Sequence, residues 1–113
     1  MPFPHATVEC ADALEIDLVE RGADAVFADP ARRADGRRIT DPEQWSPALS
    51  QVLALRESVP ALGVKVAPGI DHAALPRDAH TQWVSVDGDV VEAAIWCGPL
   101  APEGPGRSAL ILR

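Results

Sequence analysis

The segment Asp24-Ala-Val-Phe-Ala-Asp29-Pro30 is the most informative about the architecture, because it is a short apolar run between two acids and is followed by a proline. A continuous apolar run of this length is typical of a strand that is covered on both faces, as in a parallel sheet between helices. Proline cannot donate to a β-ladder, so the strand is expected to end at Asp29. The sequence therefore predicts a buried strand over residues 24–29 with a carboxylate at its end.

Five further strands are predicted from apolar or alternating runs on either side of this stretch. They cover residues 6–10, 62–67, 82–86, 89–97 and 108–112. Asp87-Gly88 separates two of them and supplies the positive φ that a two-residue turn requires. These two strands are therefore expected to form an antiparallel hairpin.

Two helices are predicted between the first three strands. Asp12 is expected to open a short helix over Ala13–Arg21, which Gly22 ends. Ser46 is expected to cap a longer helix, whose apolar side chains recur at helical spacing as far as Val59. Helices that alternate with strands, followed by an antiparallel pair, predict an α/β fold with a parallel sheet and an antiparallel edge.

The composition is that of one soluble domain. The chain has 113 residues, of which 47% are apolar and 24% are charged, and its longest apolar run is too short to cross a membrane. Cys10 and Cys97 show no metal-ligand spacing, so no metal site is predicted, and we expect two buried, reduced thiols in a cytoplasmic protein. Residues 1–98 are interpreted as the core of the domain, and residues 99–113 as a linker and terminal strand.

The charge is unevenly distributed. Ten basic and 17 acidic residues give a net charge of −7, which argues against non-specific nucleic-acid binding by the whole surface. Ala31–Arg38 nevertheless holds four arginines and one aspartate, a local charge of +3 that leaves −10 on the rest of the chain. This arginine loop suggests an anionic partner at one place. A solvated loop with surface arginines is the alternative.

Ligands of open α/β sheets bind outside the carboxyl ends of the parallel strands, where three loops are expected to meet. These loops cover residues 10–13, 29–33 and 68–72. Asp29-Pro30 would place there a carboxylate that accepts hydrogen bonds from an amino or cationic group, unless the dipeptide merely starts a turn. Asp12, with the N–H of Ala13, could read the edge of an adenine. Its alternative role is to cap the helix that follows.

Together these residues resemble the second half of a Rossmann-type S-adenosylmethionine-dependent methyltransferase. Cys10-Ala-Asp12-Ala13-Leu14 is similar to the third motif of that family, in which the aspartate contacts the adenine. Asp24–Arg33 is similar to the fourth motif, in which a strand-end acid and a proline lie beside the site of methyl transfer. The resemblance implies S-adenosylmethionine as cofactor, Asp12 and Ala13 as residues that contact it, and Asp29 and Pro30 as catalytic residues.

A more specific resemblance is to a bacterial group whose fourth motif reads DPARR followed by GRR. In that group a VK-APG strand, a hairpin with WVS, DG and VEA-W, and a THUMP-like module come next. Asp29–Gly36, Val64–Gly69 and Trp83–Trp96 follow this order. The group implies a substrate of RNA or another nucleic acid, whose phosphates would be bound by the four arginines of the loop, Arg32, Arg33, Arg37 and Arg38.

Two parts of the family pattern have no counterpart in these residues. The sequence contains no GxGxG cofactor loop, and the THUMP-like module is also absent. We therefore expect a fragment or truncated product that carries half of a cofactor pocket and is inactive in isolation. The alternative is a non-catalytic binding or interaction module that uses the arginine loop.

The resemblance also implies how the sheet is assembled. Methyltransferase sheets have the strand order 3-2-1-4-5-7-6, and this chain begins at the third strand. The strand over residues 24–29 would then have an open edge. We expect this edge to pair with a second copy and form a homodimer, unless residues 6–10 pair with it instead.

Overall fold

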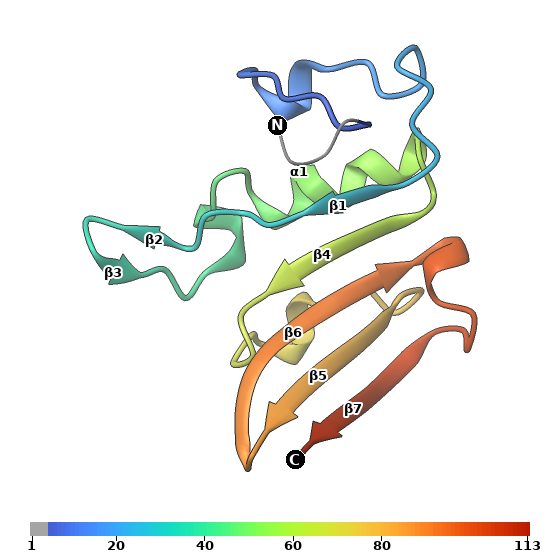
Figure 1. Cartoon of the computed structure of the whole chain (residues 1–113). Helices are drawn as coiled ribbons and strands as arrows, with labels where there is room; N and C mark the ends of the chain where they lie inside the picture. Colours follow the sequence, from blue (N-terminus) through green and yellow to red (C-terminus); the bar gives the residue numbers. More distant parts are fainter. Residues whose placement is uncertain (1–4) are drawn as a thin grey trace.

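The computed structural model describes residues 5–113 and consists of a five-stranded sheet, a small two-stranded sheet and short helices (Figure 1). The large sheet has the order β1-β4-β6-β5-β7. Its strands are β1 (Val26–Ala28), β4 (Leu62–Val66), β6 (Asp89–Cys97), β5 (His80–Val86) and β7 (Gly106–Leu112). The predicted α/β class is confirmed, and the first four positions agree with the 4-5-7-6 part of the order that the resemblance implies.

Strand directions in the large sheet are mixed. β1 runs parallel to β4, β6 runs antiparallel to both β4 and β5, and β7 runs parallel to β5. Asp87 and Gly88 join β5 to β6 with φ values of 50° and 90°, so the predicted hairpin is confirmed together with its turn. The predicted last strand is also confirmed, and it lies at the outer edge of the sheet beside β5 (Figure 1).

The core lies between the helical layer and one face of the sheet. Alternate residues of β4 and β6 point into it, which leaves Leu62, Val64 and Ile95 without solvent exposure. Leu49 and Val52 of α1 (Leu49–Leu53) are buried against the same cluster. Short 3-10 helices also lie at residues 42–44, 54–57, 72–74 and 98–100.

The opposite face of the sheet is more open, which corrects the prediction that residues 24–29 are covered on both sides. Phe27 of β1 is 60% exposed and lies with Trp96 on this face, their ring centroids 6.0 Å apart. The two rings meet over Gly63, where an added Cβ would lie 2.6 Å from Trp96 Cζ3 and 3.0 Å from Phe27 Cδ2. Gly63 is therefore required by the packing of the two aromatic side chains.

The main helix begins later than predicted. Ser46 does not cap it, because the backbone of Ser46 pairs instead with Ala31 in an isolated β-bridge, with N–H···O distances of 2.9 and 3.0 Å. Ala48 is the N-cap, and the Oε1 atom of Gln51 accepts a hydrogen bond from its N–H at 3.2 Å. The helix therefore forms only after the chain has left the bridge.

The N-terminal segment differs most from the sequence prediction. Residues 6–10 are exposed and form no strand, since no neighbouring strand lies beside them. The predicted helix shortens to one 3-10 turn, Ala13–Glu15, because the Asp17 side chain accepts a hydrogen bond from the N–H of Glu20 and starts a separate turn. Gly22 has a φ of 72° and follows that turn, so it does not end the helix for which it was predicted.

The two cysteines lie in different environments. Cys97 is 2% exposed, as predicted, whereas Cys10 is exposed, so the prediction of two buried thiols is wrong for Cys10. Glu9 beside Cys10 pairs with the guanidinium of Arg21, which lowers the pKa of the Glu9 carboxyl group.

Over residues 5–113, no helix has the length and hydropathy needed to cross a membrane.

Candidate functional site: a basic pocket at the end of strand β1

The arginine loop is a small β-hairpin. Its strands are β2 (Arg33–Ala34) and β3 (Arg37–Arg38), and Asp35 and Gly36 turn between them with φ values of 50° and 74°. Arg33 pairs with Arg38 across the hairpin. Because paired residues share a face and successive residues alternate, Arg33 and Arg38 point to one side and Arg37 to the other. Asp35-Gly36 is the same turn dipeptide as Asp87-Gly88, and the segment predicted as a loop is therefore a hairpin.

The base of the hairpin is fixed to the core by hydrogen bonds. The N–H of Ile39 donates to the carbonyl of Arg32 at 2.7 Å, which closes the hairpin. The carbonyl of Ile39 in turn accepts from the indole Nε1 of Trp45 at 2.9 Å, and Trp45 is only 4% exposed. The bridge between Ala31 and Ser46 fixes the chain directly before Arg32. The arginines therefore project from a well-anchored base.

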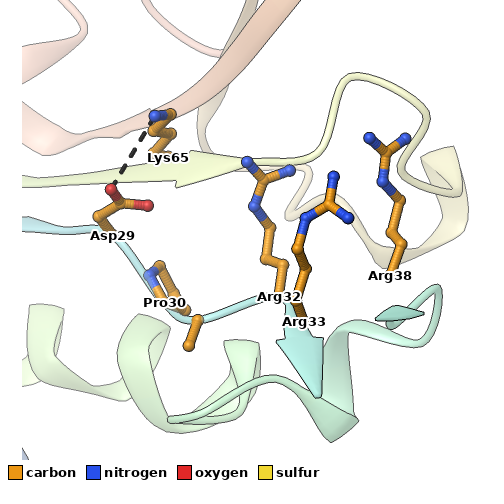
Figure 2. A pocket seen from close by; sticks show the side chains of 7 residues that line it. Asp29, Pro30, Arg32, Arg33, Arg38 and Lys65 are labelled. Atoms are coloured by element: carbon orange, nitrogen blue, oxygen red, sulfur yellow. Dashed lines mark ion pairs between the residues drawn. The ribbon is translucent and has the colours of Figure 1, made fainter. Parts of the chain in front are cut away.

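A hollow of about 290 Å³, called here the basic pocket, opens between this hairpin and the sheet (Figure 2). Its lining residues are Asp29, Pro30, Ala31, Arg32, Arg33, Arg38 and Lys65. Four cations and one carboxylate give the pocket a formal charge of +3. In the described part of the chain none of the three arginines forms an ion pair, so their donors are available to an anion.

Asp29 is the single acid of the basic pocket and follows directly after β1. Its Oδ2 atom lies 3.9 Å from the Nζ of Lys65 on β4, toward which it points in Figure 2. The two side chains are 58% and 35% exposed, so this ion pair contributes little to stability and leaves the carboxylate accessible. Pro30 is buried beside it and turns the chain away from the sheet. This geometry allows Asp29 to accept a hydrogen bond from a bound ligand.

The structure brings together most, but not all, of the predicted site residues. Asp29, Pro30, Arg32, Arg33 and Arg38 share the pocket, whereas Arg37 is not among its lining residues. Lys65 was not predicted, although a lone charge within the apolar strand Leu62–Val66 was a usable signal.

Asp12 and Ala13 lie elsewhere. The Oδ1 atom of Asp12 accepts a hydrogen bond from the N–H of Leu14 at 3.0 Å, so Asp12 does cap the short helix. It lines a separate hollow formed only by residues between 11 and 21. Of the three loops expected at one rim, residues 29–33 line the basic pocket, and Gly69 of the third loop lines a different hollow together with Arg38, which follows the second loop. The first loop contributes to neither.

Residues 5–113 place no group of three or more His, Cys, Asp or Glu side chains where they could hold a metal ion. The chemistry that the basic pocket itself supplies is anion binding by guanidinium groups next to one hydrogen-bond acceptor.

Comparison with known proteins agrees with the resemblance. Over 90 residues the chain is 37% identical to an uncharacterized S-adenosylmethionine-dependent methyltransferase of Mycobacterium tuberculosis, in strain CDC 1551 / Oshkosh and equally in strain ATCC 25618 / H37Rv. The alignment covers 77% of this chain but 25% of the relative, so the chain spans about a quarter of the length of the curated relatives it matches. No protein-family model and no solved structure matches the chain.

Proposed function

We propose that this chain is the substrate-binding part of an S-adenosylmethionine-dependent methyltransferase that acts on RNA or another nucleic acid. The observation that carries the methyltransferase part of the proposal is the 37% identity to an uncharacterized S-adenosylmethionine-dependent methyltransferase, and the arginines of the basic pocket support a nucleic-acid substrate. The strand order of the sheet supports it, because the basic pocket then lies at the carboxyl end of β1, where α/β sheets bind their ligands.

In this proposal the basic pocket receives the group that is methylated. The Asp29 carboxylate accepts a hydrogen bond from that group, and Pro30 fixes the direction in which the chain leaves the strand. Arg32, Arg33 and Arg38 bind phosphates of the substrate through charge-assisted hydrogen bonds. Arg37 faces the other side of the hairpin and is not part of this contact.

The cofactor would be S-adenosylmethionine, and the residues present fit only its adenosine end. The hollow at Asp12 is also lined by the carboxylates of Glu15, Asp17 and Glu20, which can accept hydrogen bonds from an adenine amino group and ribose hydroxyls. The same carboxylates would repel the carboxylate of the methionine end. We therefore propose that Asp12 and Ala13 contact the adenine, and that the methionine end is held by groups outside these residues.

A second candidate function is a binding module without catalysis. It is favoured by the arginines, which have no ion-pair partners in the described residues, and by a cofactor hollow that shares no residue with the basic pocket. The two candidates differ in whether Asp29 is needed for a methylated product.

The test compares the modified nucleosides of RNA from cells that carry the natural gene or an Asp29→Ala variant. The proposal predicts that one methylated nucleoside disappears from the mass spectrum of digested RNA in the variant. Asp24→Ala, at the opposite end of the same strand, is the matched control and should leave the profile unchanged. An unchanged profile in Asp29→Ala cells, with normal protein levels, would contradict the methyltransferase proposal and favour the binding module.

A further inference from the structure

The exposed apolar side chains gather around strand β7. Nine large apolar residues are exposed in the described chain, and six of them belong to β7 or to the nearby end of the β5–β6 hairpin. This β7 surface consists of Val86, Val90, Val91, Leu110, Ile111 and Leu112. Figure 1 shows β7 as the outermost strand, with its end beside the β5–β6 turn. Because successive residues of a strand alternate between faces, these side chains lie on both faces of this corner of the sheet, which favours extension of the sheet at its edge over docking on one face.

The outer edge of β7 also leaves backbone groups unpaired. The N–H of Gly106 donates to Ala79 at 3.2 Å, and the N–H of Asp87 donates to Leu112 at 3.0 Å. In a parallel ladder alternate residues bond to one neighbour, so the even-numbered residues of β7 face β5. The N–H and C=O groups of Arg107, Ala109 and Ile111 therefore point away from the sheet. A seven-residue edge with one charge and no internal proline favours pairing with another strand.

We propose that β7 pairs with β7 of a second copy, antiparallel, about a two-fold axis through Ala109. Ala109 is the midpoint of Gly106–Leu112 and is itself one of the outward-facing residues. Centred there, all seven residues of one strand face the seven of the other. Arg107, Ala109 and Ile111 would then exchange about six backbone hydrogen bonds with the second copy. The product is a continuous sheet through both copies.

The side chains fit this register. Each Arg107 lies opposite Ile111 of the second copy, and each Ser108 lies opposite Leu110. An axis through Leu110 would instead place Arg107 opposite Arg113, an unfavourable pair of like charges. The antiparallel direction also brings the basic start of one β7 toward the acidic tip of the other hairpin, at Asp87 and Asp89. This charge complementarity is why the surface fits a second copy of the chain.

The other open edge of the sheet is a poorer candidate. The homodimer predicted through residues 24–29 would use β1, but β1 has three residues, and the N–H of Val26 already donates to the carbonyl of Ala61 at 2.9 Å. Only Phe27 of β1 has both backbone groups directed outward. The two edges can therefore be tested against each other with one substitution each.

The experiment measures the mass of the full chain by sedimentation equilibrium over a hundredfold dilution. We expect twice the chain mass of 12.0 kDa at high concentration and dissociation on dilution. Ala109→Pro removes one outward donor at the axis and no bond to β5, so it should give a folded monomer with an unchanged circular dichroism spectrum. Phe27→Pro is the matched control on β1 and should leave the dimer intact. A monomer at every concentration, or a dimer that Phe27→Pro and not Ala109→Pro dissociates, overturns the proposal.

A crosslink tests the register directly. In a Cys10→Ser background, Ala109→Cys would place two thiols on hydrogen-bonded, directly opposed residues, about 5.5 Å apart at Cα, within reach of a disulfide. Leu110→Cys is the control, because its opposite residue is Ser108 and not a second cysteine. We expect oxidation to link the first variant and not the second. Equal linking of both variants, or of neither, contradicts an axis through Ala109.

Discussion

Two hairpins of this chain have the same Asp-Gly turn, but one packs into the core and the other is exposed to solvent. Asp35-Gly36 and Asp87-Gly88 both adopt left-handed φ values, and both join adjacent antiparallel strands. The β5–β6 hairpin has strands of seven and nine residues and buries Ala93, Ile95 and Cys97. The β2–β3 hairpin has two residues in each strand, and all four are exposed.

The difference lies in the residues that flank each turn. Alternating apolar side chains give β6 one face that packs into the core, so the hairpin becomes part of the architecture. Three of the four residues in β2 and β3 are arginines, which cannot be buried without partners. The same turn thus builds the sheet in one place and presents charge to solvent in the other. Substitutions at equivalent positions of the two hairpins can test this contrast.

The largest effect is expected from Ile95→Ala in β6. Ile95 has no solvent exposure, and truncating a buried isoleucine costs about 2–5 kcal/mol of unfolding free energy. Urea denaturation measures the change. Arg37→Ala, in the exposed hairpin, should alter the same quantity by less than about 0.5 kcal/mol. Similar losses in both variants would mean that the β2–β3 hairpin also belongs to the cooperative core.

Glycine-to-alanine substitutions compare the two turns themselves. Gly36 and Gly88 both have positive φ, and an added Cβ at either would meet no atom within 4 Å, so only backbone strain distinguishes the variants from the natural chain. Gly88→Ala should lower the unfolding free energy by about 1–2 kcal/mol.

Gly36→Ala should carry a similar local cost without lowering global stability, because the short hairpin can open while the core stays folded. Hydrogen exchange at the amide of Ile39, which bonds to Arg32, should accelerate about tenfold. Equal effects of Gly36→Ala and Gly88→Ala on global unfolding would contradict this separation.

Arg38→Ala and Arg37→Ala compare the two faces of the basic hairpin. If the pocket-facing side binds phosphate, Arg38→Ala should reduce the slope of log affinity against log salt by about 0.7 for single-stranded RNA. Arg37→Ala removes the same charge from the neighbouring residue and should leave the slope nearly unchanged. Fluorescence titration at several salt concentrations measures both slopes. An equal reduction of the slope in both variants would show that binding depends on the charge of the hairpin and not on the face that each arginine occupies.

The smallest effect concerns pH. Burial raises the pKa of the Cys97 thiol, although the guanidinium of Arg56 acts in the opposite direction. The folded state therefore disfavours the thiolate, and its contribution to stability is complete below the unfolded pKa, about 8.5, and is lost as pH rises further. Denaturation in urea between neutral and alkaline pH should show this decline. Cys97→Ala should flatten it, and an identical decline in that variant would exclude Cys97 as its cause.

Local signals predicted most of the sheet. Asp87-Gly88 between alternating runs specifies a hairpin, and the apolar run at 62–67 specifies a strand. Neither prediction depends on residues distant in the sequence. Thr7 and Val8 also favour a strand, but a strand needs a partner, and the structure places none beside them. Ser46 is a good helix cap by residue type, yet its pairing with Ala31, fifteen residues earlier, decides otherwise. The errors are thus the places where contacts distant in sequence decide the outcome.

The candidate site was predictable to a similar degree. Asp29 and the arginines were identified from a strand end and a charge cluster, and their roles in catalysis and substrate binding remain predictions. The separation of Arg37 from Arg38 follows from the register of the turn, which the loop interpretation did not include. Lys65 enters the pocket only because β4 lies beside β1. Neighbouring strands in a sheet, and not spacing along the chain, bring that cation to Asp29.

The exposed β2–β3 hairpin also places four arginines, at positions 32, 33, 37 and 38, on a segment that a protease can reach. Exposed loop tips are preferred sites of proteolytic nicking, and trypsin cleaves after arginine. Limited digestion should therefore cut first within this hairpin and yield two fragments of unequal length. An anion held by Arg32, Arg33 and Arg38 would shield the cut sites, so the rate of the first cleavage becomes a readout of occupancy that needs no label on either partner.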